Sequence, residues 1–295
     1  MRILVTGGSG FIGLWLTKSL LGKGAQVRVL DLKPDVPLVR DILGNTAANV
    51  EWRAGDVSDG DAVRAAAEGC DVLVHLAAIL TPACQADPVR GAEINLIGSL
   101  NVFEAARRHG IKSVVYMSSA GVFGPDDGTT PRPTTHYGAF KLAMEGCARA
   151  YWADHKIASV GFRPLVVYGP GREIGLTAGP SLACRAAARG EAYVIPFSGV
   201  SDFVHVDDVV AAYLAAIETP VADARAYTLV GDCCMAEDFA AEVCRVVPGA
   251  RITANGPLLP IAGELAPGTL RDDFPQIPRT TVRDGIAATV AYYRG

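Results

Sequence analysis

The chain of 295 residues lacks the features of membrane proteins and of nucleic-acid-binding proteins. No apolar stretch approaches the roughly 18 residues needed to span a bilayer, and there is no internal repeat or low-complexity tract. The longest basic cluster is Arg107–Arg108, and the formal net charge is −4. Because a phosphate backbone requires a concentrated positive face, we expect neither nucleic acid nor a membrane as a partner.

Cysteine patterns that would indicate disulfides or a metal site are also missing. The seven cysteines are an odd number and include the vicinal pair Cys233–Cys234, with no Cys-x-x-Cys and no metal-ligand spacing to the five histidines. We therefore expect reduced thiols, a cytoplasmic location and no metal. Since half of its residues are hydrophobic, the chain can bury a sizeable core in one large or two closely joined domains.

A glycine-rich segment close to the amino terminus predicts a phosphate-binding turn. The apolar run Ile3–Thr6 leads into GGSGFIGLWLTKSLLGKG, in which three glycines recur at intervals of three and are followed by apolar residues with helical period. Residues without a Cβ let the backbone approach a pyrophosphate, which the amino terminus of the helix can bind. The expected cofactor contacts of this turn are Gly7, Gly10, Phe11, Ile12 and Gly13.

An acidic residue after the second predicted strand indicates NAD as the cofactor. The strand Gln26–Leu30 ends at Asp31, eighteen residues after Gly13. A carboxylate at this point accepts hydrogen bonds from the adenosine ribose and repels the 2′-phosphate of NADP. Lys33 and Arg40 are the opposing observation, since either side chain could reach such a phosphate. The balance favours NAD.

Strands and helices alternate along the chain and predict an α/β fold with a doubly wound parallel (Rossmann) sheet, whose ligands bind at the carboxyl ends of the strands. The expected elements are strands Val50–Ala54, Val72–Leu76, Ser113–Ser118 and Ser159–Arg163, and helices Asp59–Glu68, roughly Val89–Arg108, and Tyr137 to about His155. Cofactor contacts at the strand ends are expected from Asp56, Val57, Leu76, Ala77 and Ala78. Asp56 could equally cap the next turn. Asn95 is also placed near the cofactor, where its amide is expected chiefly to hold a bend or a water.

Tyr137 and Lys141 are four residues apart in the segment HYGAFKLAMEGCARAYW, which predicts the start of a helix. At this spacing the two side chains share one face, so a phenol and an ammonium group can share one pocket. A nearby cation favours the phenolate, which would let the tyrosine exchange protons far below its free pKa of about 10. Tyr-x-x-x-Lys is common by chance, but the glycine turn and the pair Ser118–Ser119 strengthen the interpretation.

A series of motifs extends from residue 3 to about residue 293: TGGSGFIG, GDVSD, HLAA, MSSAGVFG, YGAFK, FRPLVVYGPG, DFVHVDDV and VRDGIAATVAYYR. In this combination and order the chain resembles the extended short-chain dehydrogenase/reductases, the NAD-dependent epimerase/dehydratase family. The resemblance implies that Tyr137 is the catalytic acid/base, that Lys141 tunes it and holds the nicotinamide ribose, and that Ser119 hydrogen-bonds the reacting oxygen. Ser119 lies five residues before Gly124, as in the family's Ser-Ser-x-x-Val-Tyr-Gly pattern. Ser118 would then meet the cofactor through its backbone.

These residues define a reaction class. With a secondary alcohol hydrogen-bonded to Ser119 and Tyr137, loss of the hydroxyl proton to the phenolate lets the carbinol hydride pass to the nicotinamide, giving ketone and NADH. The reverse step is a reduction, and return of hydride to the other face of the ketone is an epimerisation. Dehydratases of the family carry acid groups at the two positions after the catalytic hydroxyl residue. Here these positions are Ala120 and Gly121, so we do not expect dehydration.

Residues 1–163 are interpreted as the dinucleotide-binding domain, with later strands returning to it, and residues 164–295 as a small α+β substrate-binding region. Pro164 and Val167 would pass beside the nicotinamide, and the loop GPGREIGLTAGPSL is interpreted as a mobile lid. Further expected elements are a helix of roughly Ala183–Arg189, strand Ala226–Val230, helix Ala236–Val246, strand Ile252–Ala254 and a final helix Val282–Tyr293.

Two departures from the family pattern argue against a sugar nucleotide as substrate. Val166 stands where members acting on sugar nucleotides usually carry an asparagine, and Ser201 where they commonly carry a diphosphate-pairing arginine. A smaller polyol, sugar acid or hydroxy acid fits better, and Arg172 is the candidate clamp for a carboxylate. A solvated loop arginine is an equal alternative. The candidate substrate contacts are Thr81, Ser119, Val166, Arg172 and Thr177.

The remaining predictions concern structure and association. Asp207 is expected to cap a helix over Val209–Ile217, and His205 to brace the lid loop. The predicted helices Val89–Arg108 and Tyr137–His155 carry apolar residues on more than one face. Since helices at these positions pair across a two-fold axis in the family, a homodimer through a four-helix bundle is expected.

Two alternative functions stay open. The first is a nucleotide-sugar 4-epimerase of the UDP-hexose kind, whose phosphate contacts come from residues not identified from the motifs. The second is a dinucleotide-sensing regulator that binds cofactor without turnover. The presence of Ser119, Tyr137 and Lys141 argues against a regulator, because a sensor has no use for a proton-transfer group.

Overall fold

The computed structural model describes residues 1–33 and 37–295, and a parallel sheet forms its centre. Within these ranges the sheet has seven strands in the order β10-β6-β5-β4-β1-β2-β3, and every neighbouring pair is parallel. This is the predicted doubly wound Rossmann sheet, whose order reverses between β1 and β4. The strands are β1 (Arg2–Thr6), β2 (Gln26–Asp31), β3 (Val50–Ala54), β4 (Val72–His75), β5 (Ser113–Met117), β6 (Ala158–Arg163) and β10 (Ala224–Thr228).

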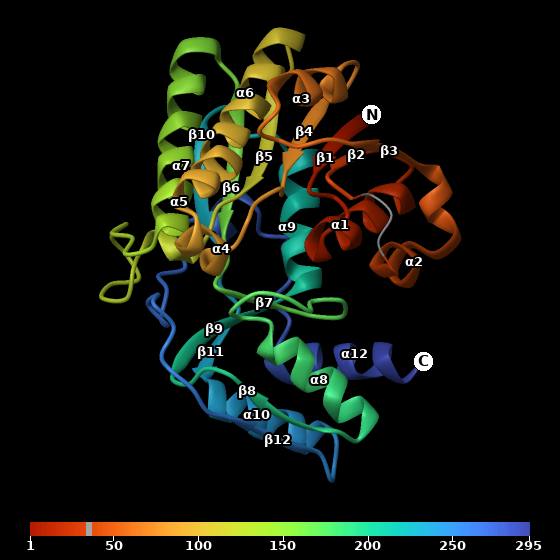
Figure 1. Cartoon of the computed structure of the whole chain (residues 1–295), viewed down its shortest axis with the longest axis vertical. Coiled ribbons are helices and arrows are strands. Elements are labelled where there is room, and N and C mark those ends of the chain that lie inside the picture. The colour runs from red at the N-terminus through yellow and green to blue at the C-terminus, as the bar shows by residue number, and fades with distance from the viewer. Residues whose placement is uncertain (34–36) are drawn as a thin grey trace.

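Helices cover both faces of the sheet, which explains why its strands are nearly continuous apolar runs. In Figure 1, α6 and α7 lie side by side on one face, whereas α1 and α9 lie on the other. The first face is covered by α3 (Gly60–Ala67), α6 (Gly98–His109) and α7 (His136–His155). The second is covered by α1 (Phe11–Gly22), α2 (Pro37–Leu43) and α9 (Val206–Glu218), and the 3-10 turn Gly44–Asn49 follows α2.

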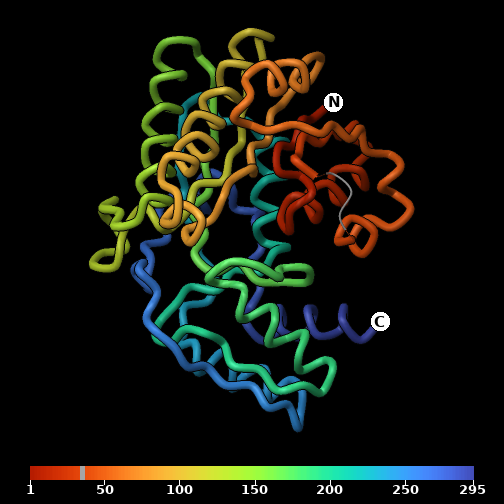
Figure 2. Tube along the Cα trace, viewed as in Figure 1, coloured from red at the N-terminus to blue at the C-terminus, as the bar shows by residue number. Residues whose placement is uncertain are grey.

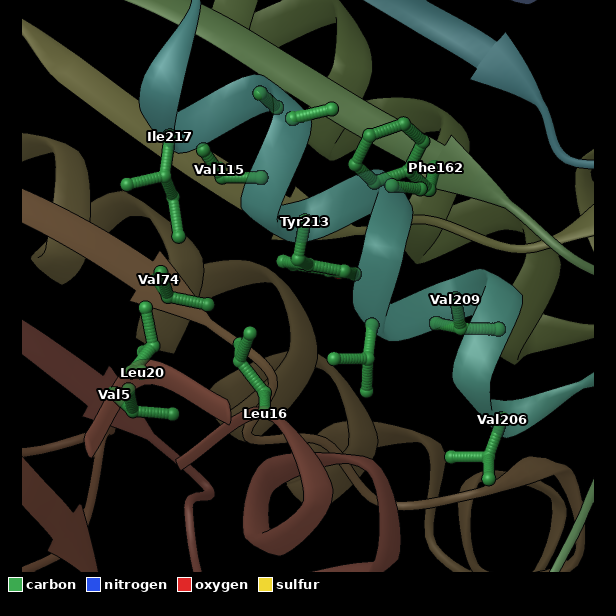
Figure 3. Packing of buried hydrophobic residues seen from close by; sticks show 14 of the residues in the cluster. Val5, Leu16, Leu20, Val74, Val115, Phe162, Val206, Val209, Tyr213 and Ile217 are labelled. Carbon is green, nitrogen blue, oxygen red and sulfur yellow. The ribbon is translucent and has the colours of Figure 1, made fainter. Parts of the chain in front are cut away.

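Helix α9 shows how the core is built from residues far apart in the sequence. Its buried side chains recur every three or four residues and face α1 and the sheet, as Figure 3 shows. Each such side chain contributes roughly 1.5–3 kcal/mol when fully buried. The residues that meet here are Val206, Val209, Tyr213 and Ile217 of α9, Leu16 and Leu20 of α1, and Val5, Val74, Val115 and Phe162 of the strands.

A smaller body packs below the carboxyl ends of the strands in the view of Figure 2, and the carboxyl terminus lies in it. In the described part of the chain it contains a three-stranded sheet, β11-β9-β7, and a parallel pair, β12-β8. Because β10 is a strand of the large sheet and α9 packs on that sheet, the chain passes between the two bodies more than once. The elements are β7 (Val166–Tyr168), α8 (Gly179–Arg189), β8 (Ala192–Ile195), β9 (Val200–His205), β11 (Asp232–Met235), α10 (Ala236–Val246), β12 (Arg251–Ala254), α11 (Leu270–Asp273) and α12 (Val282–Arg294).

The predicted long helix over Val89–Arg108 is wrong in detail. The chain instead forms α4 (Thr81–Ala86) and α5 (Pro88–Ala92), passes through a π-helical turn at Glu93–Ile97, and continues as α6. The π turn coincides with Asn95, which is completely buried and bonds to a neighbouring loop rather than to its own helix. Such single-turn π segments are frequent at functional sites.

The predicted cap of α9 is also corrected. The helix begins at Val206, so Asp207 lies inside its first turn, and the His205 Nδ1 accepts the Asp207 backbone N–H at 3.4 Å. His205 braces the small body rather than the lid loop, because its ring meets Tyr168 edge-on and its Nε2 lies 3.4 Å from the Thr289 hydroxyl of α12. Among the helices of the described residues, none has both the length and the apolar character required to cross a membrane.

Candidate active site

The glycine turn between β1 and α1 is shaped for close approach of a ligand to the backbone. Gly7 has φ +71°, and a Cβ at this position would lie 2.5 Å from the Ala77 nitrogen. A Cβ on Gly13 would lie 2.6 Å from the Gly7 carbonyl oxygen. Side chains would therefore fill the cradle, and the free N–H groups at the start of α1 offer positive dipole to an anion. Gly7, Gly10, Phe11, Ile12 and Gly13 all line the cavity in front of this turn.

The carboxyl ends of β2 and β3 form the continuation of this cradle. The Asp31 Oδ2 accepts the Ser9 backbone N–H at 3.1 Å, which fixes the carboxylate beside the turn. A cavity of about 390 Å³ opens here, and it is lined by Asp31, Asp56, Val57, Leu76, Ala77 and Ala78. A carboxylate at this edge suits a ribose diol, so the residues present fit the predicted dinucleotide. Of the opposing cations, Lys33 lines this cavity and Arg40 lies exposed on α2.

Asp56 has a partner that the sequence did not reveal. Its carboxylate forms an ion pair with Arg90 of α5, and its Oδ1 accepts the Ser58 N–H at 2.9 Å. The Arg90 guanidinium also bonds to Glu93 at 2.9 Å. Asp56 is therefore oriented by a helix more than thirty residues further along the chain.

Ser119, Tyr137 and Lys141 line a single cavity of about 180 Å³ at the ends of β4 and β5. The Thr135 side chain caps α7 by accepting the Gly138 N–H at 3.1 Å, and this cap sets the start of the helix one residue before Tyr137. The Lys141 ammonium is buried and donates to the Met117 carbonyl at 2.7 Å. Two segments, Met117–Ser119 and Thr135–Lys141, thus converge beside the glycine turn, and Ile12 after this turn lines the same cavity.

The charges in this cavity differ from the sequence-based expectation. Burial raises the pKa of Tyr137 to about 12, and the positive charge of Arg172 and a hydrogen bond with Ser119 oppose the rise. Burial lowers the pKa of Lys141 to about 8. The Lys141 Nζ lies 5.7 Å from the centre of the Tyr137 ring and points to a backbone carbonyl. Arg172 is therefore a second cation near the Tyr137 phenol, in addition to Lys141.

The two serines before the cavity have different surroundings. The Ser119 Oγ accepts the Gly121 N–H at 3.0 Å and caps a short 3-10 turn, Ala120–Val122, while its residue lines the cavity. The Ser118 hydroxyl is buried and donates to Glu145 Oε1 at 2.5 Å. The Ser118 side chain is thus occupied inside the protein, which leaves its backbone for a ligand.

Arg172 enters the same cavity from the loop after β7. Its Nη2 donates to the Thr177 hydroxyl at 2.9 Å, and its guanidinium lies 5.9 Å from the centre of the Phe11 ring. Its Nε is buried and has no hydrogen-bond partner among the described residues, and no carboxylate of that part of the chain lies within ion-pair distance. The other predicted contact residues that line this cavity are Ile12, Leu76, Ala78, Thr81, Ser118, Pro164, Val167 and Thr177.

Two of the residues predicted as contacts lie outside the lining of the two cavities. Asn95 does not line the cofactor cavity, because its amide bonds to both the N–H and the carbonyl of Ile79 at 2.9 Å. It holds the loop after β4 in place, in agreement with the structural role expected for it. Val166 is completely buried in the core of the small body and does not line the substrate cavity, because its side chain packs away from it.

Glu145 and Arg163 are the principal residues near the site that the sequence did not identify. Glu145 follows Lys141 by one helical turn, and its carboxylate pairs with Arg163 at the end of β6. The spacing of four residues was a usable signal for Glu145, since it places the carboxylate on the face of Tyr137 and Lys141. Nothing local in the sequence connects Arg163 to it.

Comparison with known proteins assigns the chain to a family. The family model described as "NAD dependent epimerase/dehydratase family" matches residues 3–229. A UDP-glucose 4-epimerase from Mycolicibacterium smegmatis (strain ATCC 700084 / mc(2)155) is 31% identical over 316 residues, which cover 100% of this chain and 99% of the relative.

Two further relatives match over little more than half of their own length. An uncharacterized protein, y4nG, of Sinorhizobium fredii (strain NBRC 101917 / NGR234) is 34% identical over 72% of this chain and 52% of its own. A uronate dehydrogenase from Pseudomonas syringae pv. tomato (strain ATCC BAA-871 / DC3000) is 31% identical over 55% of this chain and 58% of its own.

Solved structures share the whole fold. A UDP-glucose 4-epimerase from Thermus thermophilus, in complex with NAD, superposes with a TM-score of 0.84 at 26% identity, covering 100% of this chain and 99% of the other. A GalE-like L-threonine dehydrogenase from Cupriavidus necator, in its holo form, superposes with a TM-score of 0.88 at 23% identity, covering 99% of each chain. At that identity the second likeness shows the fold alone.

Proposed function

Because the chain belongs to the NAD-dependent epimerase/dehydratase family, we propose that it transfers hydride to and from a secondary alcohol of a small hydroxy acid or sugar acid that carries no nucleotide. The protein is an NAD-dependent enzyme of the epimerase/dehydrogenase type. When bound, NAD accepts the hydride and can return it. The glycine cradle and Asp31 are the residues that we expect to hold it.

The observation that carries the proposal is the guanidinium of Arg172, which has no anionic partner among the residues that the structure describes. A partly buried cation without an anionic partner costs free energy, which a ligand carboxylate in the cavity would recover. Burial lowers the pKa of Arg172, which expresses the same cost. Its planar fork matches a carboxylate, and it lies in the cavity of Tyr137 and Ser119. The Pseudomonas uronate dehydrogenase, by its name, acts on an acid of this class.

The positions expected to meet a nucleotide support a substrate without one. Val166 is completely buried among apolar side chains. Ser201 is completely buried on β9, and its hydroxyl has no partner among the described residues. Neither position offers a cation or an amide to a diphosphate.

The chain's own groups divide the proton transfer among them. We assign Ser119 to hold the alcohol oxygen and Tyr137 to take its proton as the hydride leaves the carbinol carbon. Forming the phenolate from a phenol with a pKa of about 12 requires nearby positive charge, which Arg172 and Lys141 supply. In the reducing direction Tyr137 returns the proton to the oxygen.

A nucleotide-sugar 4-epimerase is the second candidate, and one observation favours it directly. The UDP-glucose 4-epimerase of M. smegmatis matches this chain along its full length. In such an enzyme the hydride returns to the opposite face of the retained ketone, so isomer forms without net NADH. The third candidate, a regulator without turnover, is disfavoured because Ser119, Tyr137 and Lys141 share one cavity.

A substrate screen tests the proposal. Purified protein with NAD is incubated with hydroxy acids and sugar acids, with the polyols that lack their carboxylate, and with UDP-glucose, while NADH absorbance and product stereochemistry are followed. We expect turnover of an acid and a kcat/KM at least about tenfold lower for its neutral counterpart. Turnover of UDP-glucose without turnover of any acid would replace this proposal by the second candidate.

We further propose a homodimer through the α5–α6 and α7 side of the large sheet. Val89 on α5 and Ile97 at the π turn are 72% and 45% exposed, which is unusual for large apolar side chains and suits a covered surface. Light scattering after size exclusion should give twice the mass of the chain. A cytoplasmic location stays a prediction.

A further inference from the structure

Glu145 forms the centre of a buried polar network directly behind the active site. It is only 1% exposed, and its carboxylate lies outside the cavity lining. The carboxylate accepts the Arg163 Nε at 2.7 Å, a second guanidinium nitrogen of Arg163, and the Ser118 hydroxyl at 2.5 Å. A paired guanidinium and a hydroxyl compensate most of the cost of burying this charge.

The network joins the two chain segments that carry the reactive groups, the end of β5 and α7, to the end of β6. Ser118 lies between Met117, which receives the Lys141 ammonium, and the residue we assign to the substrate oxygen. Arg163 is followed by Pro164, which lines the cavity and whose carbonyl accepts the Ala120 N–H at 3.0 Å. Glu145 thereby ties α7 to the ends of β5 and β6, one helical turn below Lys141.

The Arg163 side of the network is packed as well as bonded. Its guanidinium lies 5.3 Å from the centre of the Phe123 ring, in the segment that follows Ser119. Phe123 is buried and belongs to the core of the small body. The Arg163–Glu145 ion pair is therefore held in one conformation. A change at Glu145 should alter the position of the ends of both β5 and β6.

Glu145 is also the one anion facing Lys141 in the described part of the chain. Burial raises the pKa of Tyr137 and of the Cys84 thiol and lowers that of His75 to about 3, so all three are neutral at pH 7. Burial lowers the pKa of Lys141 to about 8, and Cys84 and, after it, the negative charge of Glu145 oppose this fall. The ionisable groups around Lys141 are Tyr137, Glu145, Cys84, His75, Arg163 and Arg172.

We propose that Glu145 is a positioning residue for the reaction, which keeps Lys141 charged and holds the end of β5, where the Met117 carbonyl receives the Lys141 ammonium and from which Ser119 follows. This inference rests on the proposed function for the roles of these two residues. Under this proposal, the residues that contribute to the reaction include a carboxylate behind the cavity as well as the residues that line it. Glu145 itself neither donates nor accepts the transferred proton.

The test uses Glu145→Gln, which keeps the shape and one hydrogen-bonding oxygen but removes the charge. Glu242→Gln is the matched control, because Glu242 is 9% exposed on α10, accepts the Arg283 Nε at 2.7 Å and lies outside the active-site cavity. For both variants we measure kcat and KM between pH 6 and pH 10, NAD affinity by protein fluorescence over the same range, and the melting temperature.

We expect Glu145→Gln to lower kcat at least about tenfold with little change in KM, because the groups that hold the substrate stay in place. The pH at which activity and NAD affinity fall on the alkaline side should move down by about one unit, since Lys141 loses its proton more easily without a neighbouring anion. Glu242→Gln should change the melting temperature only. The fall of activity and of NAD affinity at high pH is the alkaline limb of each profile. If the alkaline limbs of wild type and Glu145→Gln coincide, the proposal is overturned.

A second variant covers the case in which Glu145→Gln fails to fold because Arg163 is left buried and unpaired. In Glu145→Gln/Arg163→Met both charges are removed, so no uncompensated cation remains. Loss of the Arg163 cation favours charged Lys141 and therefore offsets part of the effect of losing Glu145. Because the effect of Glu145 on Lys141 outweighs that of Arg163, the proposal predicts a downward shift of the alkaline limb in this double variant that is smaller than in Glu145→Gln. An alkaline limb at the wild-type pH would refute it. Since NAD affinity needs no substrate, a failed substrate screen would count against the proposed function and leave this measurement decisive.

Discussion

Arg172 offers the sharpest test of which substrate the cavity takes. Its guanidinium bonds to Thr177 and leaves a buried Nε without a partner among the described residues, beside the residues assigned to proton transfer. Arg172→Met removes the charge and the donors but keeps an unbranched side chain of comparable reach. If the guanidinium binds a substrate carboxylate, an acid substrate loses this contact in Arg172→Met. Its neutral counterpart has no such contact to lose.

The size of the effect follows from the chemistry of such a pair. Removing one partner of a desolvated, hydrogen-bonded charge pair costs about 2–5 kcal/mol. At about 1.4 kcal/mol for each factor of ten, this corresponds to a loss of about 30-fold to 4,000-fold in kcat/KM for the acid. Arg172 also lowers the pKa of Tyr137, so its removal slows turnover of both substrates. That common loss cancels in the ratio of the two kcat/KM values.

The assay is therefore the ratio of kcat/KM for an acid substrate to kcat/KM for the corresponding polyol, in wild type and in Arg172→Met. Arg189→Met, at an exposed arginine near the end of α8, serves as the control and should leave the ratio unchanged. NAD affinity is measured in parallel, because Arg172 also borders the cavity in front of the glycine turn. An unchanged ratio combined with weaker NAD binding would refute the clamp and make Arg172 a ligand of the cofactor phosphates.

Three further predictions concern other parts of the molecule. Tyr137→Phe should lower kcat by about 10²–10⁴ with NAD affinity nearly unchanged, since only the proton-transfer group is lost; equal losses of both in kinetics and fluorescence titration would contradict its role. Asp31→Ala should weaken NAD binding by about 10- to 150-fold and reduce the preference for NAD over NADP, because hydrogen bonds to a charged group are lost. An unchanged ratio of the affinities for NAD and NADP would show that Asp31 does not bind the ribose. Burial holds the pKa of His75 at about 3 in the folded protein, whereas unfolded histidine titrates near 6.5. The unfolded state therefore gains a proton first, and stability falls below about pH 6.5 by up to about 1.4 kcal/mol per pH unit. We measure the free energy of unfolding in urea between pH 6.5 and pH 4.5 for wild type and His75→Gln. This free energy should fall less steeply with decreasing pH in the variant. Equal pH dependence in the two proteins would show that His75 is not the group responsible.

Most of the large sheet could be predicted from the sequence because its strands are buried on both faces. Apolar runs flanked by glycine or aspartate mark them clearly, and the predicted Val50–Ala54 and Ala236–Val246 coincide with β3 and α10. The short strands β7 and β8 were not predicted. They lie in segments rich in proline and glycine, where pairing between distant segments, rather than local pattern, creates the strand.

The break in the helix at Asn95 could not be predicted either, because it also depends on a contact between distant segments. Its residues have helical periodicity on both sides of the π turn, so local pattern indicates one continuous helix. The break becomes apparent only when the Asn95 amide is seen bonded to Ile79, sixteen residues earlier. Contacts of this kind depend on tertiary structure, and sequence spacing carries no signal for them.

The two cations of the active site show where sequence reasoning reaches its limit. A spacing of four residues correctly places Lys141 on the face of Tyr137, because that follows from helix geometry alone. The Met117 carbonyl, on another element, fixes the direction of the ammonium, and a second positive charge near the phenol comes from Arg172 in a loop. Glu145 then holds the charge of Lys141 from behind. Local spacing thus identifies the reactive pair, whereas the electrostatics that would make it reactive depend on residues brought together only by folding.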